Sequence, residues 1–197
     1  MTGTVIIDSG GANLASLQFA FERLGAAARV SADAREIAAA ERVVLPGVGS
    51  AVDAMRRLRG ADLAQLIPTL TQPVLGICLG MQLLFESSAE GATDCLAILP
   101  GAVHRLEASA RRPVPHMGWN RLASLTNDPL LAGVGPEAYF YFVHSYAAAP
   151  GPFTLAPVEY GGPLSAVVRR KNFWGVQFHP ERSAASGARV LENFLGL

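Results

Sequence analysis

Short apolar segments alternate with helical patterns through the first half of the chain, and this alternation constrains the fold more than any other feature. The predicted strands lie at residues 5–8, 27–30, 42–45 and 74–77, and the predicted helices at 14–24, 33–40, after Ser50, and at 79–85. Asn13 and Ser50 are predicted to cap helices, and Gly25 to end one. Strands that alternate with helices form a parallel sheet with right-handed crossovers. We therefore predict an α/β fold with an open, mostly parallel, twisted sheet flanked by helices.

The pattern changes after Gly91. Strand-like segments follow one another at residues 102–105, 120–125, 139–143, 155–160, 166–170 and 174–178, and a final helix is predicted at 183–195. We predict an antiparallel β annex added to the same sheet. The chain has 197 residues with no repeat and no low-complexity linker, so we expect a single domain over residues 1–197.

Composition argues against several classes of protein. Half of the residues are hydrophobic, and 16 Lys and Arg balance 16 Asp and Glu, which indicates a globular protein with no basic surface for nucleic acid. The longest apolar stretch, residues 73–85, is too short and too interrupted by glycine to span a membrane, and the N-terminus has no basic region typical of a signal peptide. Two cysteines give no disulfide framework, so we expect a cytoplasmic, reducing location.

Residues 76–80, Gly-Ile-Cys-Leu-Gly, follow a predicted strand and have the spacing of a nucleophile elbow. Such a turn would expose Cys78 at the carboxyl end of the strand, where the functional sites of open α/β sheets lie. The N-terminus of the next helix would stabilise a thiolate, and the Leu79 N–H would face a developing oxyanion. A buried core cysteine is the alternative interpretation of this turn.

His179 and Glu181 follow a later predicted strand, with Pro180 between them. In an extended segment, residues two apart share a face. Glu181 could then hold one ring nitrogen of His179 while the other nitrogen meets Cys78. Such an arrangement would support acyl transfer through a thioester. Taken alone, such a segment is more often a surface turn with a solvated glutamate.

Residues 46–49, Pro-Gly-Val-Gly, also end a predicted strand. Glycines on both sides of Val48 would allow a peptide to flip and turn an N–H towards a substrate oxygen. An ordinary strand-to-helix turn is the alternative.

Cys95 lies among apolar residues and is expected to be buried and inert. His104 and His116 lack metal-ligand spacing, and no nucleotide-binding loop is present, so we expect neither metal nor cofactor.

The segments at 46–49, 76–82 and 175–181 together resemble the three signature blocks of class I (triad) glutamine amidotransferases. Within that family, Met81 and the segments 115–120 and 142–146 are similar to the glutaminase subunits of imidazole glycerol phosphate synthases, which serve histidine biosynthesis. Residues 8–14 resemble that group's Asp-Tyr-Gly-x-Gly-Asn-Leu segment, which lies at its partner interface. They depart from it at Ser9 and Ala12, where tyrosine and glycine are usual.

The resemblance implies a flavodoxin-like sheet and the hydrolysis of glutamine to glutamate and ammonia. Cys78 would be the nucleophile, His179 the general acid and then the base, and Glu181 its orienting group. The N–H groups of Val48 and Leu79 would form the oxyanion hole. The resemblance also implies glutamine-binding residues Gly47, Gly49, Gln82, His144, Ser145 and Tyr146, and partner-interface residues Asn13, Met117, Trp119 and Tyr141. The alternative interpretation of the aromatic and methionine residues in this set is that their side chains lie in the hydrophobic core.

Nothing in the sequence could use ammonia once it is released, so a partner is expected. The resemblance implies a heterodimer with a (β/α)₈ cyclase subunit that consumes an N-phosphoribosyl formimino ribonucleotide. Three alternatives stay open. The first is a glutaminase subunit of anthranilate or aminodeoxychorismate synthase, which more often shows histidine after the elbow. The others are a cysteine hydrolase acting alone and a catalytically inactive binding module.

Overall fold

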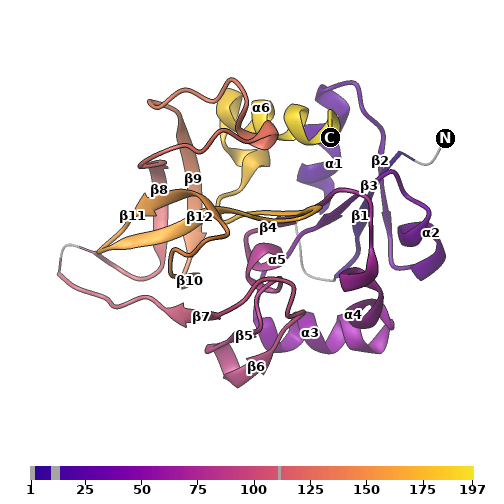
Figure 1. Ribbon diagram of the computed structural model, residues 1–197, viewed down its shortest axis with the longest axis horizontal. Helices are drawn as coiled ribbons and strands as arrows, with labels where there is room; N and C mark the ends of the chain where they lie inside the picture. The colour runs from indigo at the N-terminus through magenta and orange to yellow at the C-terminus, as the bar shows by residue number, and fades with distance from the viewer. Residues whose placement is uncertain (1–2, 10–13, 111) are drawn as a thin grey trace.

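The computed structural model describes residues 3–9, 14–110 and 112–197, and these form an α/β fold around a seven-stranded sheet (Figure 1). In spatial order its strands are β11 (Thr154–Glu159), β12 (Pro163–Arg170), β13 (Phe173–Val176), β4 (Val74–Ile77), β3 (Arg42–Leu45), β1 (Thr4–Ile7) and β2 (Ala28–Ser31). The strands from β13 to β2 pair in parallel, whereas β12 pairs antiparallel with both of its neighbours. The predicted mostly parallel sheet is confirmed.

Helices cover both faces of this sheet (Figure 1). One face carries α1 (Leu14–Arg23) and α6 (Ala184–Leu195); the other carries α2 (Ala34–Ala38), α3 (Ala51–Gly60), α4 (Leu63–Leu66) and α5 (Leu79–Gln82). Strand side chains alternate between the faces because their period is two. In β1, Ile6 packs in the core beneath α1 and α6, whereas Val5 and Ile7 pack in the core on the opposite face.

The predicted annex is only partly an extension of the central sheet. A separate four-stranded sheet contains β10 (Tyr146–Ala148), β7 (Ala102–Arg105), β5 (Ser87–Ser88) and β6 (Thr93–Asp94), and β8 (His116–Arg121) pairs with β9 (Tyr139–His144) as a two-stranded ribbon. The expectation of one continuous sheet is therefore wrong for these strands. The ribbon instead packs one of its faces against the hydrophobic core. Phe140 and Phe142 are fully buried on that face and join the core beneath α6.

Three predicted elements also have boundaries that are wrong by three residues or more. The strand predicted at 166–170 is β12, which begins at Pro163. The helix predicted at 79–85 ends at Gln82, because the carbonyls of residues 83–85 accept hydrogen bonds from the N–H groups of residues 96–99. The strand predicted at 120–125 is β8, which begins at His116. Its start shows no apolar–polar alternation because Met117 and Trp119 on its exposed face are apolar. The described residues also contain short 3-10 turns η1 (Ile67–Thr69), η2 (Glu90–Ala92), η3 (Pro129–Leu131) and η4 (Pro180–Arg182).

The predicted cap at Ser50 and the predicted stop at Gly25 are confirmed. The Ser50 hydroxyl accepts a hydrogen bond from the Asp53 N–H at 3.1 Å and caps α3. Gly25 follows α1 with a positive φ of 74°. The predicted cap Asn13 lies outside the described residues. Among the described helices, none has the length and apolarity that crossing a membrane requires.

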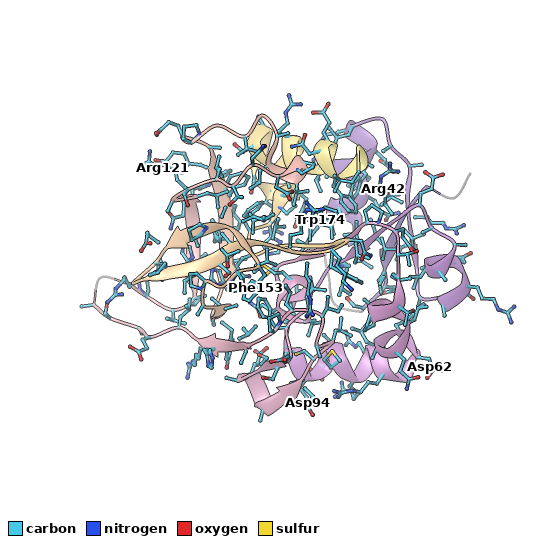
Figure 2. All side chains as sticks on the ribbon, in the orientation of Figure 1. Arg42, Asp62, Asp94, Arg121, Phe153 and Trp174 are labelled. Atoms are coloured by element: carbon cyan, nitrogen blue, oxygen red, sulfur yellow. The ribbon has the colours of Figure 1, made fainter. Side chains whose placement is uncertain are left out.

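A buried polar cluster anchors the start of β13. Asp128 accepts hydrogen bonds from Trp174 Nε1 at 3.0 Å and from Arg169 Nη1 at 2.7 Å, and the Arg169 guanidinium lies 4.4 Å from the centroid of the Trp174 ring. Figure 2 shows Trp174 in the interior of the molecule. A buried carboxylate is tolerated here because three donors, the third being the Leu130 N–H at 2.9 Å, replace its hydration. The cluster fixes β13, which leads directly to Gln177 and His179.

Candidate active site

Cys78 lies on a strained turn between β4 and α5. Its φ of 55° and ψ of −110° lie in a region that costs a non-glycine residue on the order of 1–3 kcal/mol. The flanking glycines are needed for close approach. A Cβ at Gly76 would lie 2.8 Å from the Gly80 carbonyl oxygen, and a Cβ at Gly80 would collide with the carbonyl oxygen of Leu45. The elbow predicted from the sequence is therefore present.

The environment of the thiol differs from the prediction in two respects. Cys78 is 7% exposed, so its sulfur is sheltered instead of standing free above the sheet. The following helix α5 has only four residues, so its dipole offers less stabilisation to a thiolate than a long helix would. Other donors must therefore contribute more to stabilising the charge on Cys78.

His179 and Glu181 form a buried pair beside the thiol. The carboxylate oxygen Oε1 of Glu181 lies 2.8 Å from Nδ1 of His179, and the two side chains are 5% and 9% exposed. The sequence predicted an extended segment, but Pro180 opens the 3-10 turn η4, which curls the carboxylate back onto the ring. With Nδ1 engaged by Glu181, Nε2 is left for Cys78. The backbone is held as well, since the His179 N–H donates to the Tyr141 carbonyl at 2.9 Å.

The proton on His179 is stabilised by its neighbours. Burial alone would lower the pKa of His179, but hydrogen bonds to Cys78 and Glu181 and the negative charges of both raise it to about 10. The imidazole is therefore protonated near neutral pH when it faces a thiolate. Chemically, the arrangement provides a nucleophile and an acid in contact with each other.

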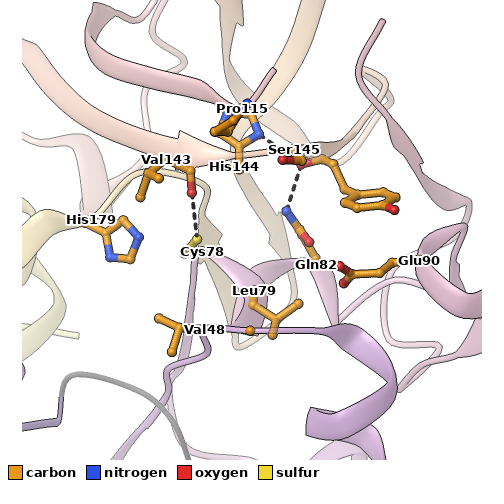
Figure 3. Close-up of a pocket in the computed structure, with 12 residues that line it drawn as sticks. Val48, Cys78, Leu79, Gln82, Glu90, Pro115, Val143, His144, Ser145 and His179 are labelled. Atoms are coloured by element: carbon orange, nitrogen blue, oxygen red, sulfur yellow. Dashed lines mark hydrogen bonds between the residues drawn. The ribbon is translucent and has the colours of Figure 1, made fainter. Parts of the chain in front are cut away.

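A cavity of about 330 Å³ opens at this pair (Figure 3). It brings together most of the residues that the sequence proposed for the oxyanion hole and for glutamine. The lining consists of Val48, Gly49, Cys78, Leu79, Gln82, Glu90, Pro115, Val143, His144, Ser145, Tyr146 and His179. Gly47 is absent from this lining. A Cβ there would come within 2.9 Å of the Gly80 nitrogen and the Leu79 side chain, so close packing requires glycine at this position.

The hydrogen bonds of Gln82 define what it can offer to a ligand. Its Nε2 donates to the Tyr146 carbonyl at 2.8 Å and to Oε1 of Gln177 at 2.9 Å. Both N–H bonds of Gln82 are thereby used, so only its Oε1 remains to accept a hydrogen bond from a ligand. The sequence pattern proposed Gln82 as a binding residue but could not distinguish a donor from an acceptor.

His144 supports the cavity wall as a neutral side chain. Its Nδ1 lies 2.9 Å from the Tyr146 carbonyl, so Nδ1 carries the proton, and its Nε2 accepts from Nδ1 of His116 at 3.0 Å. Burial is the main cause that lowers the pKa of each of these histidines to about 4. Among the described residues, no group of His, Cys, Asp and Glu side chains has the arrangement of a metal site.

Sequence reasoning missed Glu90, Val143 and the contacts of Gln177. Glu90 supplies the carboxylate of the cavity lining, and its Oε2 accepts from the Ala51 N–H at 2.7 Å. The Cys78 thiol points at the Val143 carbonyl, with Sγ and O 3.8 Å apart (Figure 3). The one local feature near Glu90 is Gly91, after which the pattern of elements changes, and it carries no information about a binding site.

Of the predicted interface residues on the β8–β9 ribbon, Met117 and Trp119 are exposed and Tyr141 is half-buried, so the interpretation that they are core is wrong for Met117 and Trp119. Met117 is 67% and Trp119 53% exposed, and Trp119 packs edge-on against its cross-strand neighbour Tyr141 with ring centroids 5.9 Å apart. Tyr139 on the same ribbon is 50% exposed. These side chains form an apolar surface, which we call the ribbon face, and Tyr141 connects it to the backbone of His179. The fourth predicted interface residue, Asn13, lies outside the described residues.

Cys95 is half-buried, not fully buried as predicted. Burial raises the pKa of its thiol to about 11, so it stays protonated near neutral pH. Its Sγ donates to the Thr93 carbonyl at 3.6 Å. The two cysteines therefore differ in their surroundings, and Cys95 offers a matched control for substitutions at Cys78.

Comparison with known proteins agrees with this fold and shows the family of the chain. Residues 5–196 match the family model described as glutamine amidotransferase class-I. In solved structures, the fold resembles a glutamine amidotransferase with a TM-score of 0.75, at 18% identity and with 98% and 97% of the two chains covered. It also resembles the glutaminase domain of Trypanosoma brucei CTPS with bound acivicin, with a TM-score of 0.67 at 13% identity and 100% and 92% coverage. The chain belongs to the class I glutamine amidotransferase family.

Curated relatives narrow the group within this family. The chain is 52% identical over 195 residues to the imidazole glycerol phosphate synthase subunit HisH of Xanthomonas campestris pv. campestris (strain 8004), covering 99% of this chain and 98% of the relative. It is equally similar, with the same coverage, to the HisH subunit of Xylella fastidiosa (strain 9a5c). Within the family it therefore falls among the HisH subunits, which confirms the resemblance found in the sequence.

Proposed function

We propose that this chain is the glutaminase subunit of an imidazole glycerol phosphate synthase, releasing ammonia for a cyclase subunit in histidine biosynthesis. The observation that carries the proposal is Cys78 on its strained elbow, with the His179–Glu181 pair beside it in one cavity. The identity with HisH relatives supports this function over a glutaminase subunit of anthranilate or aminodeoxychorismate synthase.

The reaction begins with the Cys78 thiolate, which attacks the side-chain amide carbon of glutamine. The C–S bond forms, and the carbonyl π electrons move to the oxygen, where the N–H groups of Val48 and Leu79 stabilise the negative charge. His179 then gives its Nε2 proton to the amide nitrogen as the C–N bond breaks and ammonia leaves. The result is a glutamyl thioester on Cys78 and a neutral imidazole held through Nδ1 by Glu181.

The second half of the reaction uses the same groups in reverse. Neutral His179 takes a proton from water, and the resulting hydroxide attacks the thioester carbon. When the tetrahedral intermediate collapses, the C–S bond breaks and its electron pair returns to Cys78 as thiolate. Glutamate leaves, and the imidazolium–thiolate pair is restored.

Glu90 is the natural partner for the α-ammonium group of glutamine. It is the acidic side chain in the cavity lining, opposite in sign to that group. We expect Glu90→Gln to raise KM about 10-fold or more with little change in kcat, because a hydrogen bond to a charged group far from the reacting amide contributes roughly 1.5–3 kcal/mol to binding. Glutamine keeps an acceptor for the Ala51 N–H, so the α3 contact survives.

Steady-state glutaminase kinetics of the complex would measure this effect. Glu86→Gln is the matched control, since Glu86 is nearby in sequence but bonds the Gly101 N–H outside the cavity lining. A fall in kcat at unchanged KM in Glu90→Gln would contradict a role in binding the ammonium group.

The ribbon face supports a partner interface. Exposed aromatic and methionine side chains are enriched where proteins meet, and here they lie on the strand pair that contacts the backbone of His179. We propose that the cyclase subunit, a (β/α)₈ barrel, covers this face together with Asn13 and receives ammonia there.

We further infer that residues 1–197 form one domain, since both halves of the chain contribute strands to the central sheet. We also infer a cytoplasmic location, where the catalytic thiol stays reduced.

The isolated chain should be a poor glutaminase that the partner activates when the partner holds its nucleotide. Gly49 beside Val48 has a φ of 88°, and Val48 is 38% exposed, so a turn of the Val48 peptide meets little resistance. If the Val48 N–H is turned away at rest, one of two oxyanion donors is missing, which typically costs about 10²–10³-fold in rate. We expect kcat to rise by roughly that factor on activation, with a smaller change in KM.

The measurement compares glutaminase kinetics of the chain alone, with the cyclase partner, and with partner plus nucleotide. Equal rates under all three conditions would favour a hydrolase acting alone and would contradict the proposed subunit function. No glutaminase activity under any condition would favour an inactive binding module.

A further inference from the structure

A chain of side-chain amides connects the cavity wall to the sulfur of Cys78, and its direction can be assigned. The carbonyl of Tyr146 can only accept, so the atom of Gln82 that lies 2.8 Å from it must be the nitrogen Nε2. The second N–H of that nitrogen points to Gln177, which must present its oxygen at 2.9 Å. Gln177 therefore turns its own Nε2 to Sγ of Cys78, at 3.8 Å.

Gln177 has little freedom to move away from this position. It is fully buried, directly after β13, and its backbone N–H donates to the Ala166 carbonyl at 2.8 Å. Its side-chain oxygen is held by Gln82, which is itself only 5% exposed. The N–H that faces the sulfur is therefore a preorganised donor, of the kind that stabilises charge without further rearrangement.

We propose that Gln177 is a further catalytic residue, which donates an N–H to the Cys78 thiolate and holds the sulfur in position for attack. The inference rests on the proposed glutaminase function, in which Cys78 is the nucleophile. The donor acts twice: on the thiolate before it attacks the amide carbon, and again when the C–S bond breaks and the electron pair returns to sulfur. Neither step requires Gln177 to gain or lose a proton.

The surroundings of Cys78 show why such a donor is useful. The neutral thiol faces the Val143 carbonyl, whose oxygen repels the sulfur once the proton is gone. Besides Cys78, the ionisable residues of the cavity lining are His179, with Glu181 behind it, together with His144, Tyr146 and Glu90. His144 is neutral, since burial lowers its pKa to about 4, and Glu90 is acidic, so neither favours a thiolate. A neutral N–H donor adds to the support that His179 gives the thiolate.

The test measures the pH dependence of Cys78 alkylation by iodoacetamide in the full-length chain. Gln177→Glu keeps an acceptor for Gln82 but removes the N–H, and Gln177→Met removes both polar groups at similar length. We expect the pH midpoint of alkylation to rise by about one unit in Gln177→Met, because a hydrogen bond to a charged group contributes on the order of 1.5 kcal/mol and sulfur is a weak acceptor. The rise should be larger in Gln177→Glu, because the introduced carboxylate also repels the thiolate. Glutaminase kcat of the complex should fall about 10-fold or more with a smaller change in KM.

Gln72→Glu is the matched control, because the Gln72 amide also bonds a backbone carbonyl but lies outside the cavity lining. An unchanged alkylation midpoint in folded Gln177 variants, with an active wild type, would overturn the inference. An inactive wild-type complex would instead contradict the proposed function itself.

A second experiment needs no substitution at Gln177. In nuclear magnetic resonance spectra, the side-chain amide signals of Gln177 should titrate with Cys78 in the wild type and stop titrating in Cys78→Ser. Signals that do not respond to pH in the wild type would also overturn the inference.

Discussion

Cys78→Ala should abolish glutamine-dependent synthesis by the complex and leave ammonia-dependent synthesis largely intact. Removing the sulfur removes the only route to the thioester, whereas the cyclase chemistry takes place in the partner. The strained backbone at Cys78 should tolerate alanine about as well, because the φ of 55° restricts every side chain with a Cβ similarly. The measurement is product formation by the complex, first with glutamine and then with an ammonium salt at high pH.

Cys95→Ala is the matched control and should retain glutamine-dependent activity, since that half-buried thiol lies outside the cavity lining. Loss of both the glutamine-dependent and the ammonia-dependent activity in Cys78→Ala would mean that Cys78 serves the fold or the interface.

His179→Ala should reduce glutamine turnover by about 10²–10⁴-fold, the usual worth of a positioned general acid and base. Hydrogen bonds and charge from Cys78 and Glu181 raise the pKa of His179 to about 10, so near neutral pH the wild type holds a proton ready for departing ammonia. The variant has none, and its thiolate loses a cationic neighbour. Single-turnover and steady-state glutaminase assays, together with alkylation of Cys78, would separate the two effects: alkylation should slow but remain possible.

Glu181→Gln should be milder than His179→Ala. The amide oxygen of glutamine can still accept from Nδ1 of His179, so the ring keeps its orientation while the charge beside it is lost. If Glu181→Gln proved as damaging as His179→Ala, the negative charge of Glu181 would be essential, and its assignment as an orienting group would be wrong.

Much of the scaffold could be read from local patterns. The apolar strands between Val5 and Ile77 can be predicted because they alternate with helical patterns. The Ser50 cap of α3 can be predicted because its contact lies within four residues of Ser50. The elbow could also be predicted from its own five residues, although the close approach that requires Gly80 comes from Leu45 on β3. The second half was harder, since strands that pair antiparallel can join any free edge. The β8–β9 ribbon does not extend the central sheet, because Phe140 and Phe142 are buried in the core beneath α6.

The sequence by itself determined the parallel sheet, the elbow and the types of residue available for acyl transfer, because these depend on periodicity, glycine placement and side-chain chemistry over short spans. Only the tertiary structure decided which polar atoms meet. It placed the Glu90 carboxylate in the glutamine cavity, used both N–H bonds of Gln82 within the protein, and turned the Gln177 amide to the sulfur of Cys78. Gln82 and Gln177 are 95 residues apart. The orientation of each amide follows from what its partner can donate or accept, and that is known only once folding has brought the partners together.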